Sequence, residues 1–184
     1  MSRPLRADAQ RNRARVLEVA AETFAAEGLS VPVHEIARRA GVGTGTVSRH
    51  FPTKESLFQA ILLGRMEELV RQATDLAERE RPEEAFFAFF AAMVGAGAAN
   101  KGLVDALAGA GFDFEAVAAE SRYDVMGAWQ ALLEGAQRAG TIREDADIAD
   151  VKALLTGCID RERHAPDPSA RARMLTIVRH GLRP

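Results

Sequence analysis

The sequence predicts an all-α protein, and three observations support that prediction. Alternating runs of Val, Ile, Thr and Tyr, which are typical of half-buried strands, are missing. Apolar residues instead recur at the period of about 3.6 residues that marks amphipathic helices, as Val16, Ala20 and Phe24 do. With 184 residues and a hydrophobic content of 47%, the chain can form one compact domain or two domains that share an interface.

Helices are expected in the first part of the chain over residues 8–27, 32–40, 44–50 and 54–79. Gly28 and Gly41 end the first two of these helices, and Pro32 suits the first position of the second. Pro52 breaks the chain after the third helix, and Thr53 can cap the fourth. The helices are therefore separated by short Gly or Pro joints.

Further helices are expected over residues 82–99, 103–107, 113–139, 147–163 and 168–180. The longest weakly polar stretch, residues 85–99, is shorter than the roughly 20 residues that cross a bilayer. It is interpreted as a buried helix. The N-terminus has no apolar run typical of a signal peptide, and Cys158 is the single cysteine, so the protein is expected to be cytoplasmic.

Charge is distributed unevenly along the chain. The formal net charge is −2, which by itself does not indicate a nucleic-acid partner. Residues 1–64 nevertheless carry +3, residues 65–160 carry −9 and residues 161–184 carry +4. The arginines that precede the first apolar face form a predicted basic arm, and they are Arg3, Arg6, Arg11, Arg13 and Arg15.

Residues 32–51 fit a helix-turn-helix. Where two short helices cross steeply, the residue at their closest approach must be small, and Ala37 is in that place. Gly41 can supply the left-handed conformation of the turn. Val42 and Val47 would fill the angle between the helices, which leaves polar side chains on the outer part of the third helix.

A helix with short polar side chains at its start suits base-edge and phosphate contacts in a major groove. Lys54, in the first turn of the next helix, is predicted to seat a phosphate. The residues predicted to contact DNA are Thr44, Gly45, Thr46, Ser48, Arg49, His50 and Lys54, with Arg3, Arg6 and Arg11 of the arm.

Two other interpretations of this segment are weaker. An ordinary αα corner with solvated polar residues would not explain the adjacent cation and the basic arm. Gly41, Gly43 and Gly45 alternate as in a nucleotide-binding fingerprint, but they follow a helix rather than a strand.

The string EIARRAGVGTGTVSRHFPTKESLF resembles the TetR family of bacterial transcriptional repressors, and the likeness covers residues 16–63. Ser48 departs from the family pattern, because a tyrosine that reaches a phosphate is usual there. Gly43 and Val31 stand where capping Ser or Thr residues are common. The resemblance implies a small DNA-binding part, a helical body with a ligand cavity, and a homodimer formed by the last two helices.

Combined with the helix pattern, this resemblance predicts a flexible basic arm over residues 1–10, a DNA-binding domain over residues 11–64 and a ligand-binding and dimerisation domain over residues 65–184. The aromatic-rich helix after Pro82 is apolar on all sides and should be central. An apolar pocket with Tyr123 as its polar handle would be lined by Phe86, Phe90, Met93, Tyr123, Met126 and Trp129. Close-packed core is the alternative for each of these residues.

The last two helices each have an apolar face, so they can pair with their copies or pack within one chain. These faces comprise Val151, Leu154, Leu155, Cys158 and Ile159 on the first of the two helices and Met174, Ile177, Val178 and Leu182 on the second. The histidines fall in separate segments without metal-ligand spacing, so no catalytic site, metal or cofactor is predicted. The favoured function is a homodimeric repressor that a small-molecule effector releases from a palindromic operator. The alternative is a helical small-molecule-binding protein whose DNA contacts have decayed, as Ser48 and Val31 suggest.

Overall fold

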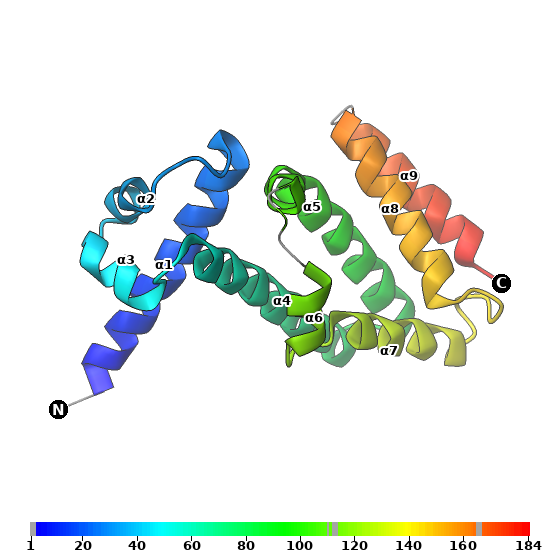
Figure 1. The fold of residues 1–184 in the computed structure, drawn as a ribbon. Helices are drawn as coiled ribbons and strands as arrows, with labels where there is room; N and C mark the ends of the chain where they lie inside the picture. Colours follow the sequence, from blue (N-terminus) through cyan, green and yellow to red (C-terminus); the bar gives the residue numbers. More distant parts are fainter. Residues whose placement is uncertain (1–2, 110, 112–113, 165–166) are drawn as a thin grey trace. The chain divides into compact units, whose positions relative to one another are not determined.

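The computed structural model describes residues 3–109, 111, 114–164 and 167–184, and within these ranges it is helical without strands (Figure 1). The all-α expectation is therefore confirmed. The helices are α1 (Arg3–Glu27), α2 (Val33–Ala40), α3 (Thr44–His50), α4 (Lys54–Arg79), α5 (Pro82–Gly109), α6 (Phe114–Glu120), α7 (Val125–Arg138), α8 (Ile148–His164) and α9 (Pro168–Leu182). Within the described part, none of the helices has both the length and the apolar character that crossing a membrane requires.

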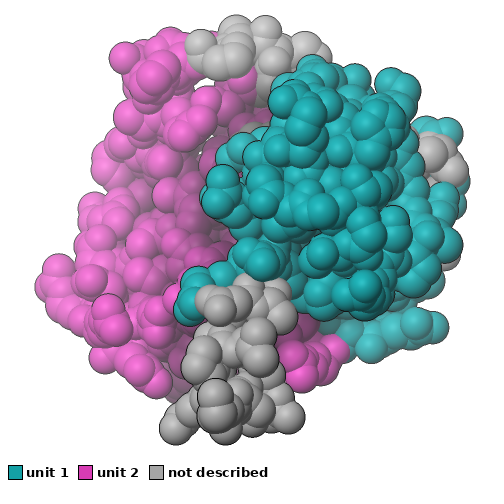
Figure 2. Space-filling model, turned by 90° about the vertical axis from the view of Figure 1, so that its left-hand side faces the viewer, with its two compact units in different colours: residues 1–65, 100–121 teal, residues 66–99, 122–184 magenta. Residues whose placement is uncertain are grey.

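The chain divides into two compact units, which Figure 2 distinguishes by colour. Unit 1 comprises Met1–Arg65 and Asn100–Ser121, and unit 2 comprises Met66–Ala99 and Arg122–Pro184. The first boundary, after Arg65, lies next to the predicted one after residue 64. The assignment of residues 100–121 to unit 1 was not expected from the sequence.

The core of unit 1 is built from the apolar faces of α1, α2, α3 and the beginning of α4. The ring of Phe24 packs edge-on against that of Phe58, with a centroid distance of 5.0 Å. This arrangement follows from the helical period of the apolar residues in α1. The buried members of this core are Val16, Ala20, Ala21, Phe24, Val31, Ile36, Ala37, Ala40, Val47, Phe51, Leu57, Phe58 and Ile61.

Two helix starts in unit 1 differ from the sequence prediction. Helix α1 begins at Arg3 rather than at residue 8, because Pro4 is tolerated in a first turn and the residues after it favour helix. Most of the segment predicted as a flexible arm is thus part of α1. Pro32 is extended, with φ −76° and ψ 149°, and it precedes α2 as the N-cap residue instead of opening the helix.

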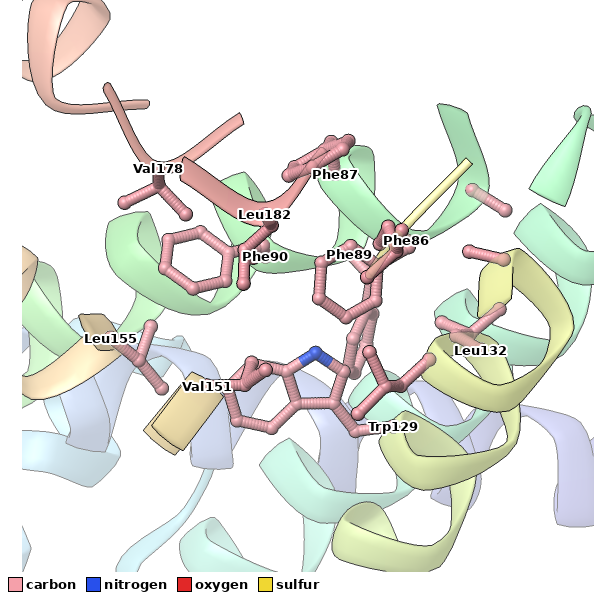
Figure 3. Packing of buried hydrophobic residues seen from close by; sticks show 14 of the residues in the cluster. Phe86, Phe87, Phe89, Phe90, Trp129, Leu132, Val151, Leu155, Val178 and Leu182 are labelled. Carbon is pink, nitrogen blue, oxygen red and sulfur yellow. The ribbon is translucent and has the colours of Figure 1, made fainter. Parts of the chain in front are cut away.

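The core of unit 2 surrounds the phenylalanines of α5 and the indole of Trp129 from α7 (Figure 3). Phe86, Phe89 and Phe90 are fully buried, which confirms that this part of α5 is central. Residues of α8 and α9 complete the cluster, among them Val151 and Val178.

Two helices of the second half also differ from the prediction. The expected helices over residues 82–99 and 103–107 are one helix, α5, because its internal glycines weaken a helix without breaking it. The expected long helix over residues 113–139 is divided into α6 and α7. Asp124 caps α7, and its side chain accepts a hydrogen bond of 2.7 Å from the backbone N–H of Gly127, so a new helix begins there.

Candidate nucleic-acid interface and ligand-binding core

The turn between α2 and α3 has the geometry of a helix-turn-helix. Gly41 adopts the left-handed conformation at φ 69° and ψ 31°, which costs glycine no side-chain clash. The backbone N–H of Val42 donates to the carbonyl of Ala37 over 3.0 Å. Ala37 is fully buried, as a small residue between crossing helices needs to be.

Helix α3 turns Val47 inward and presents its polar residues outward. Gly43 serves as the N-cap residue without a side-chain bond, and its carbonyl accepts from the N–H of Thr46 over 2.9 Å. Thr46 is half-buried. The exposed residues of α3 are Thr44, Gly45, Ser48, Arg49 and His50. A Cβ atom added to Gly45 would meet no atom within 4 Å, so the backbone of α3 is open to an approaching molecule at this point.

Arg49 differs from the arginines of α2 in having no ion pair. Arg38 binds Glu35 with two hydrogen bonds of 2.7 Å, and Arg39 binds both Glu35 and Glu27. Hydrogen bonds from Arg38 and Arg39 hold the pKa of the Glu35 carboxyl at about 2. Within the described residues no carboxylate lies at ion-pair distance from Arg49, and its side chain is exposed.

Lys54 is engaged inside the domain. Its ammonium donates to the backbone carbonyl of Leu29 and lies 5.7 Å from the centroid of the Phe24 ring. These contacts join the first turn of α4 to the end of α1 and the loop after it. The structure thus gives Lys54 a positioning role that sequence reasoning did not find, since the contact depends on two segments 25 positions apart.

Arg13 and Arg15 of α1 lie beside the helix-turn-helix. The guanidinium carbon of Arg13 is 5.5 Å from the centroid of the Phe51 ring. Arg11, also on α1, is exposed. A Cβ atom at Gly41 would lie 3.9 Å from Nη2 of Arg15, so Arg15 reaches the turn itself. Its position there depends on how α1 packs on α2, which no sequence signal reports. The side chains of Arg3 and Arg6 lie outside the described part of the chain.

Comparison with known proteins gives the family. The family model described as bacterial regulatory proteins, tetR family, matches residues 16–61, and the model described as the SbtR-like transcriptional regulator C-terminal domain matches residues 81–184, more than half of the chain. The chain belongs to the TetR family of transcriptional regulators. It is a DNA-binding protein of the helix-turn-helix type, and the predicted resemblance is confirmed.

Among solved TetR-family structures, the chain is 50% identical to a TetR transcription regulatory protein from Mycobacterium vanbaalenii, with a TM-score of 0.82, over 98% of this chain and 100% of that one. It is 32% identical to the TetR regulator SCO0520 from Streptomyces coelicolor, with a TM-score of 0.80, over 94% and 98% of the two chains. The HTH-type regulator SrpR from Pseudomonas putida is 38% identical over 86 residues, which is 46% of this chain and 40% of SrpR. The likeness to this curated relative thus spans less than half of its length.

In this TetR-family body the predicted pocket residues have different environments. Phe86, Phe90 and Trp129 are fully buried, whereas Met93 is half-buried and Met126 is 41% exposed. The structure brings the two phenylalanines and the tryptophan together, with a centroid distance of 6.0 Å between Phe90 and Trp129.

Tyr123, the predicted polar handle, is already engaged. Its hydroxyl accepts a hydrogen bond of 2.6 Å from Arg122, and the same guanidinium lies 4.9 Å from its ring centroid.

The apolar residues of the last two helices divide between core and surface. Val151, Leu155, Cys158, Val178 and Leu182 are buried within the chain. Burial raises the pKa of the Cys158 thiol, so the thiol stays protonated. Two large apolar side chains on these helices stay outside this core, and they are Leu154, 39% exposed, and Ile177, 64% exposed.

Proposed function

We propose that this TetR-family regulator is a homodimeric repressor that binds a palindromic operator and is released from it by a small-molecule effector. The observation that carries the DNA-binding part is the exposed, unpaired guanidinium of Arg49 on the outer side of α3. An arginine in a major groove can bind O6 and N7 of guanine with two hydrogen bonds. Thr44 and Ser48 beside it can contact base edges or phosphates.

The exposed apolar side chains of α8 and α9 support a dimer through these helices. Leu154, Gly157 and Arg161 follow the spacing of one helical stripe, as do Arg173, Ile177 and His180. A two-helix surface with an apolar centre and charged or polar flanks suits a four-helix interface with a second copy. Such a dimer would place two recognition helices roughly 34 to 36 Å apart, which requires a palindromic site.

The aromatic core of unit 2 supports the effector part of the proposal. An effector that changes the spacing of the two DNA-binding units needs to contribute a coupling free energy of only about 1 to 3 kcal/mol. The buried aromatic cluster of Phe86, Phe89, Phe90 and Trp129 is the part of unit 2 in which we place such a molecule.

The substitution Arg49→Ala tests the repressor. In gel-shift titrations with the DNA upstream of its own gene at moderate salt, it should weaken binding roughly 5- to 150-fold, since one bidentate base contact contributes about 1 to 3 kcal/mol. Arg138→Ala is the matched control, because Arg138 is also exposed but lies on α7 and pairs with Glu134 at 3.6 Å. Lys54→Ala is unsuitable as a DNA-contact test because Lys54 supports the fold.

Equal binding by the parent protein and Arg49→Ala would reject the repressor as proposed, whereas absence of DNA binding by the parent protein would favour a small-molecule-binding protein with decayed DNA contacts. Two features favour that second candidate. Ser48 is too short for the phosphate contact that the family's tyrosine makes, and Val31 is buried and offers only its backbone as a contact.

A further inference from the structure

Trp129 contains a buried hydrogen-bond donor that no acceptor satisfies. The side chain is fully buried, and in the described part of the chain Nε1 of Trp129 is the one buried side-chain nitrogen or oxygen without a partner. Leaving such a group unpaired destabilises a fold, and the large majority of buried donors are paired. Phenylalanine would supply aromatic surface at this position without this cost. The presence of tryptophan there instead needs an explanation in terms of its indole N–H.

The described buried side chains that share a cluster with the indole are apolar. Its ring meets Phe89 at a centroid distance of 6.3 Å and Phe90 at 6.0 Å, and Leu132 and Val151 belong to the same cluster. Figure 3 shows the indole nitrogen on the edge of the ring that faces the phenylalanines of α5. The donor is therefore directed toward the most aromatic part of the core.

This environment limits what can satisfy the donor. A buried water molecule needs two to four polar partners, and among the described residues of unit 2 the one buried polar or charged side chain is Glu162, which pairs with Arg171. A carboxylate or phosphate would be buried without a cation, which is strongly unfavourable. A neutral oxygen on an otherwise apolar molecule meets neither objection, because it accepts one hydrogen bond and packs its remaining atoms against the rings.

We propose that Nε1 of Trp129 is the polar anchor of the effector site, and that the effector is a small, uncharged, mainly apolar molecule with an accessible carbonyl or ether oxygen. This inference rests on the effector-binding part of the proposed function. It moves the polar handle from Tyr123, whose hydroxyl accepts from Arg122, to Trp129. Met93, half-buried and packed on the same cluster, is an unbranched side chain that can shift to admit the molecule.

Because Trp129 is the single tryptophan of the chain, its indole gives one signal in a ¹H–¹⁵N spectrum of the full-length protein. Acetophenone and ethylbenzene serve as probes of similar shape, one with a carbonyl oxygen and one without. We expect acetophenone to move the indole proton signal downfield in a saturable way, and ethylbenzene to leave it without a downfield shift. In Trp129→Phe, acetophenone should bind at least about tenfold more weakly, whereas ethylbenzene should bind within about twofold of its parent affinity.

Three results would overturn the proposal. One is an indole proton of the ligand-free protein that already has a hydrogen-bonded shift or exchanges rapidly with water. The second is an equal shift with both probes, and the third is no shift with acetophenone. All are measured on the parent protein without DNA, so they do not depend on whether Trp129→Phe folds. A failure of Arg49→Ala to weaken DNA binding would reject the repressor and leave this result unaffected.

Discussion

Lys54 and Arg49 show why two cations on neighbouring helices of one motif serve different purposes. Lys54 begins α4, and its ammonium is bound to the carbonyl of Leu29 beside the ring of Phe24. Arg49 is exposed and has no carboxylate partner within the described residues. At the residue scale, therefore, the ammonium of Lys54 is engaged within unit 1, and the exposed guanidinium of Arg49 is the proposed DNA contact.

We expect Lys54→Met to destabilise the protein by about 1 to 2 kcal/mol, because it removes a charged donor from a partly buried carbonyl and keeps the apolar stem. Urea unfolding followed by circular dichroism measures the change. Lys152→Met is the matched control, since Lys152 is exposed on α8 and its loss should alter stability by less than about 0.5 kcal/mol. Equal stability of the two variants would contradict the positioning role of Lys54.

At the scale of elements, ion pairs join α9 to the beginning of α5. Arg179 donates to both carboxylate oxygens of Glu84 at 3.1 and 2.9 Å, and its guanidinium lies 4.6 Å from the ring centroid of Phe87. Arg183 donates to Glu83 at 3.1 Å. The acidic first turn of α5 and the basic last turn of α9 also suit the dipoles of their helices.

These ion pairs predict that the stability of the folded protein depends on pH. The hydrogen bonds from Arg179 lower the pKa of the Glu84 carboxyl from its ordinary 4.5. A lowered pKa in the folded state stabilises the protein above the pKa of the unfolded chain, and this contribution is lost as the pH falls from about 4.5 through the folded pKa. Arg179→Met should therefore cost about 1 kcal/mol at neutral pH and less at about pH 3.

Urea unfolding at neutral and at acidic pH tests this dependence. Arg71→Met is the control, because Arg71 pairs with Glu68 within the exposed surface of one helix and should contribute little at either pH. If Arg179→Met and the parent protein lost the same stability between the two pH values, the pair would not be the source of the acid dependence.

At the scale of the whole molecule, ion pairs account for part of the positive formal charge of the C-terminal segment. Residues 161–184 carry +4 with Glu162 and Asp167 already counted, and four of their arginines pair with carboxylates of the described chain, two of them with carboxylates of α5. These pairs are Arg171 with Glu162, Arg173 with Asp167, Arg179 with Glu84 and Arg183 with Glu83. The pairs with Glu84 and Glu83 thus offset two of these four positive charges within unit 2, and in residues 1–64 Arg49 is exposed without a carboxylate partner among the described residues.

The proposed dimer predicts that a carboxylate in the centre of its apolar surface separates the two copies. Ile177→Asp should convert a dimer into a monomer in analytical ultracentrifugation, because the new charge would be buried without a partner. Met126→Asp is the matched control, since Met126 is a similarly exposed apolar residue on α7 rather than on α8 or α9. A monomeric parent protein, or an unchanged dimer in Ile177→Asp, would reject this interface.

The sequence alone was sufficient for the helical class, the helix-turn-helix and its family. These depend on local features: the period of apolar residues, the glycine at a left-handed turn, and a small residue where helices cross. Helix boundaries at α1, α5 and α7 were predicted less well. Local propensities change gradually along a chain, and at α7 the boundary is fixed by the cap that Asp124 forms with Gly127.

The tertiary structure decided the properties that depend on residues far apart in the chain. Only packing shows that Arg38 and Arg39 are paired while Arg49 is not, and that Lys54 reaches Leu29. Only packing buries the indole of Trp129 without a hydrogen-bond acceptor among the described residues. Amino-acid types determine which groups can donate, accept or carry charge, but whether a partner is within reach depends on how distant segments fold together.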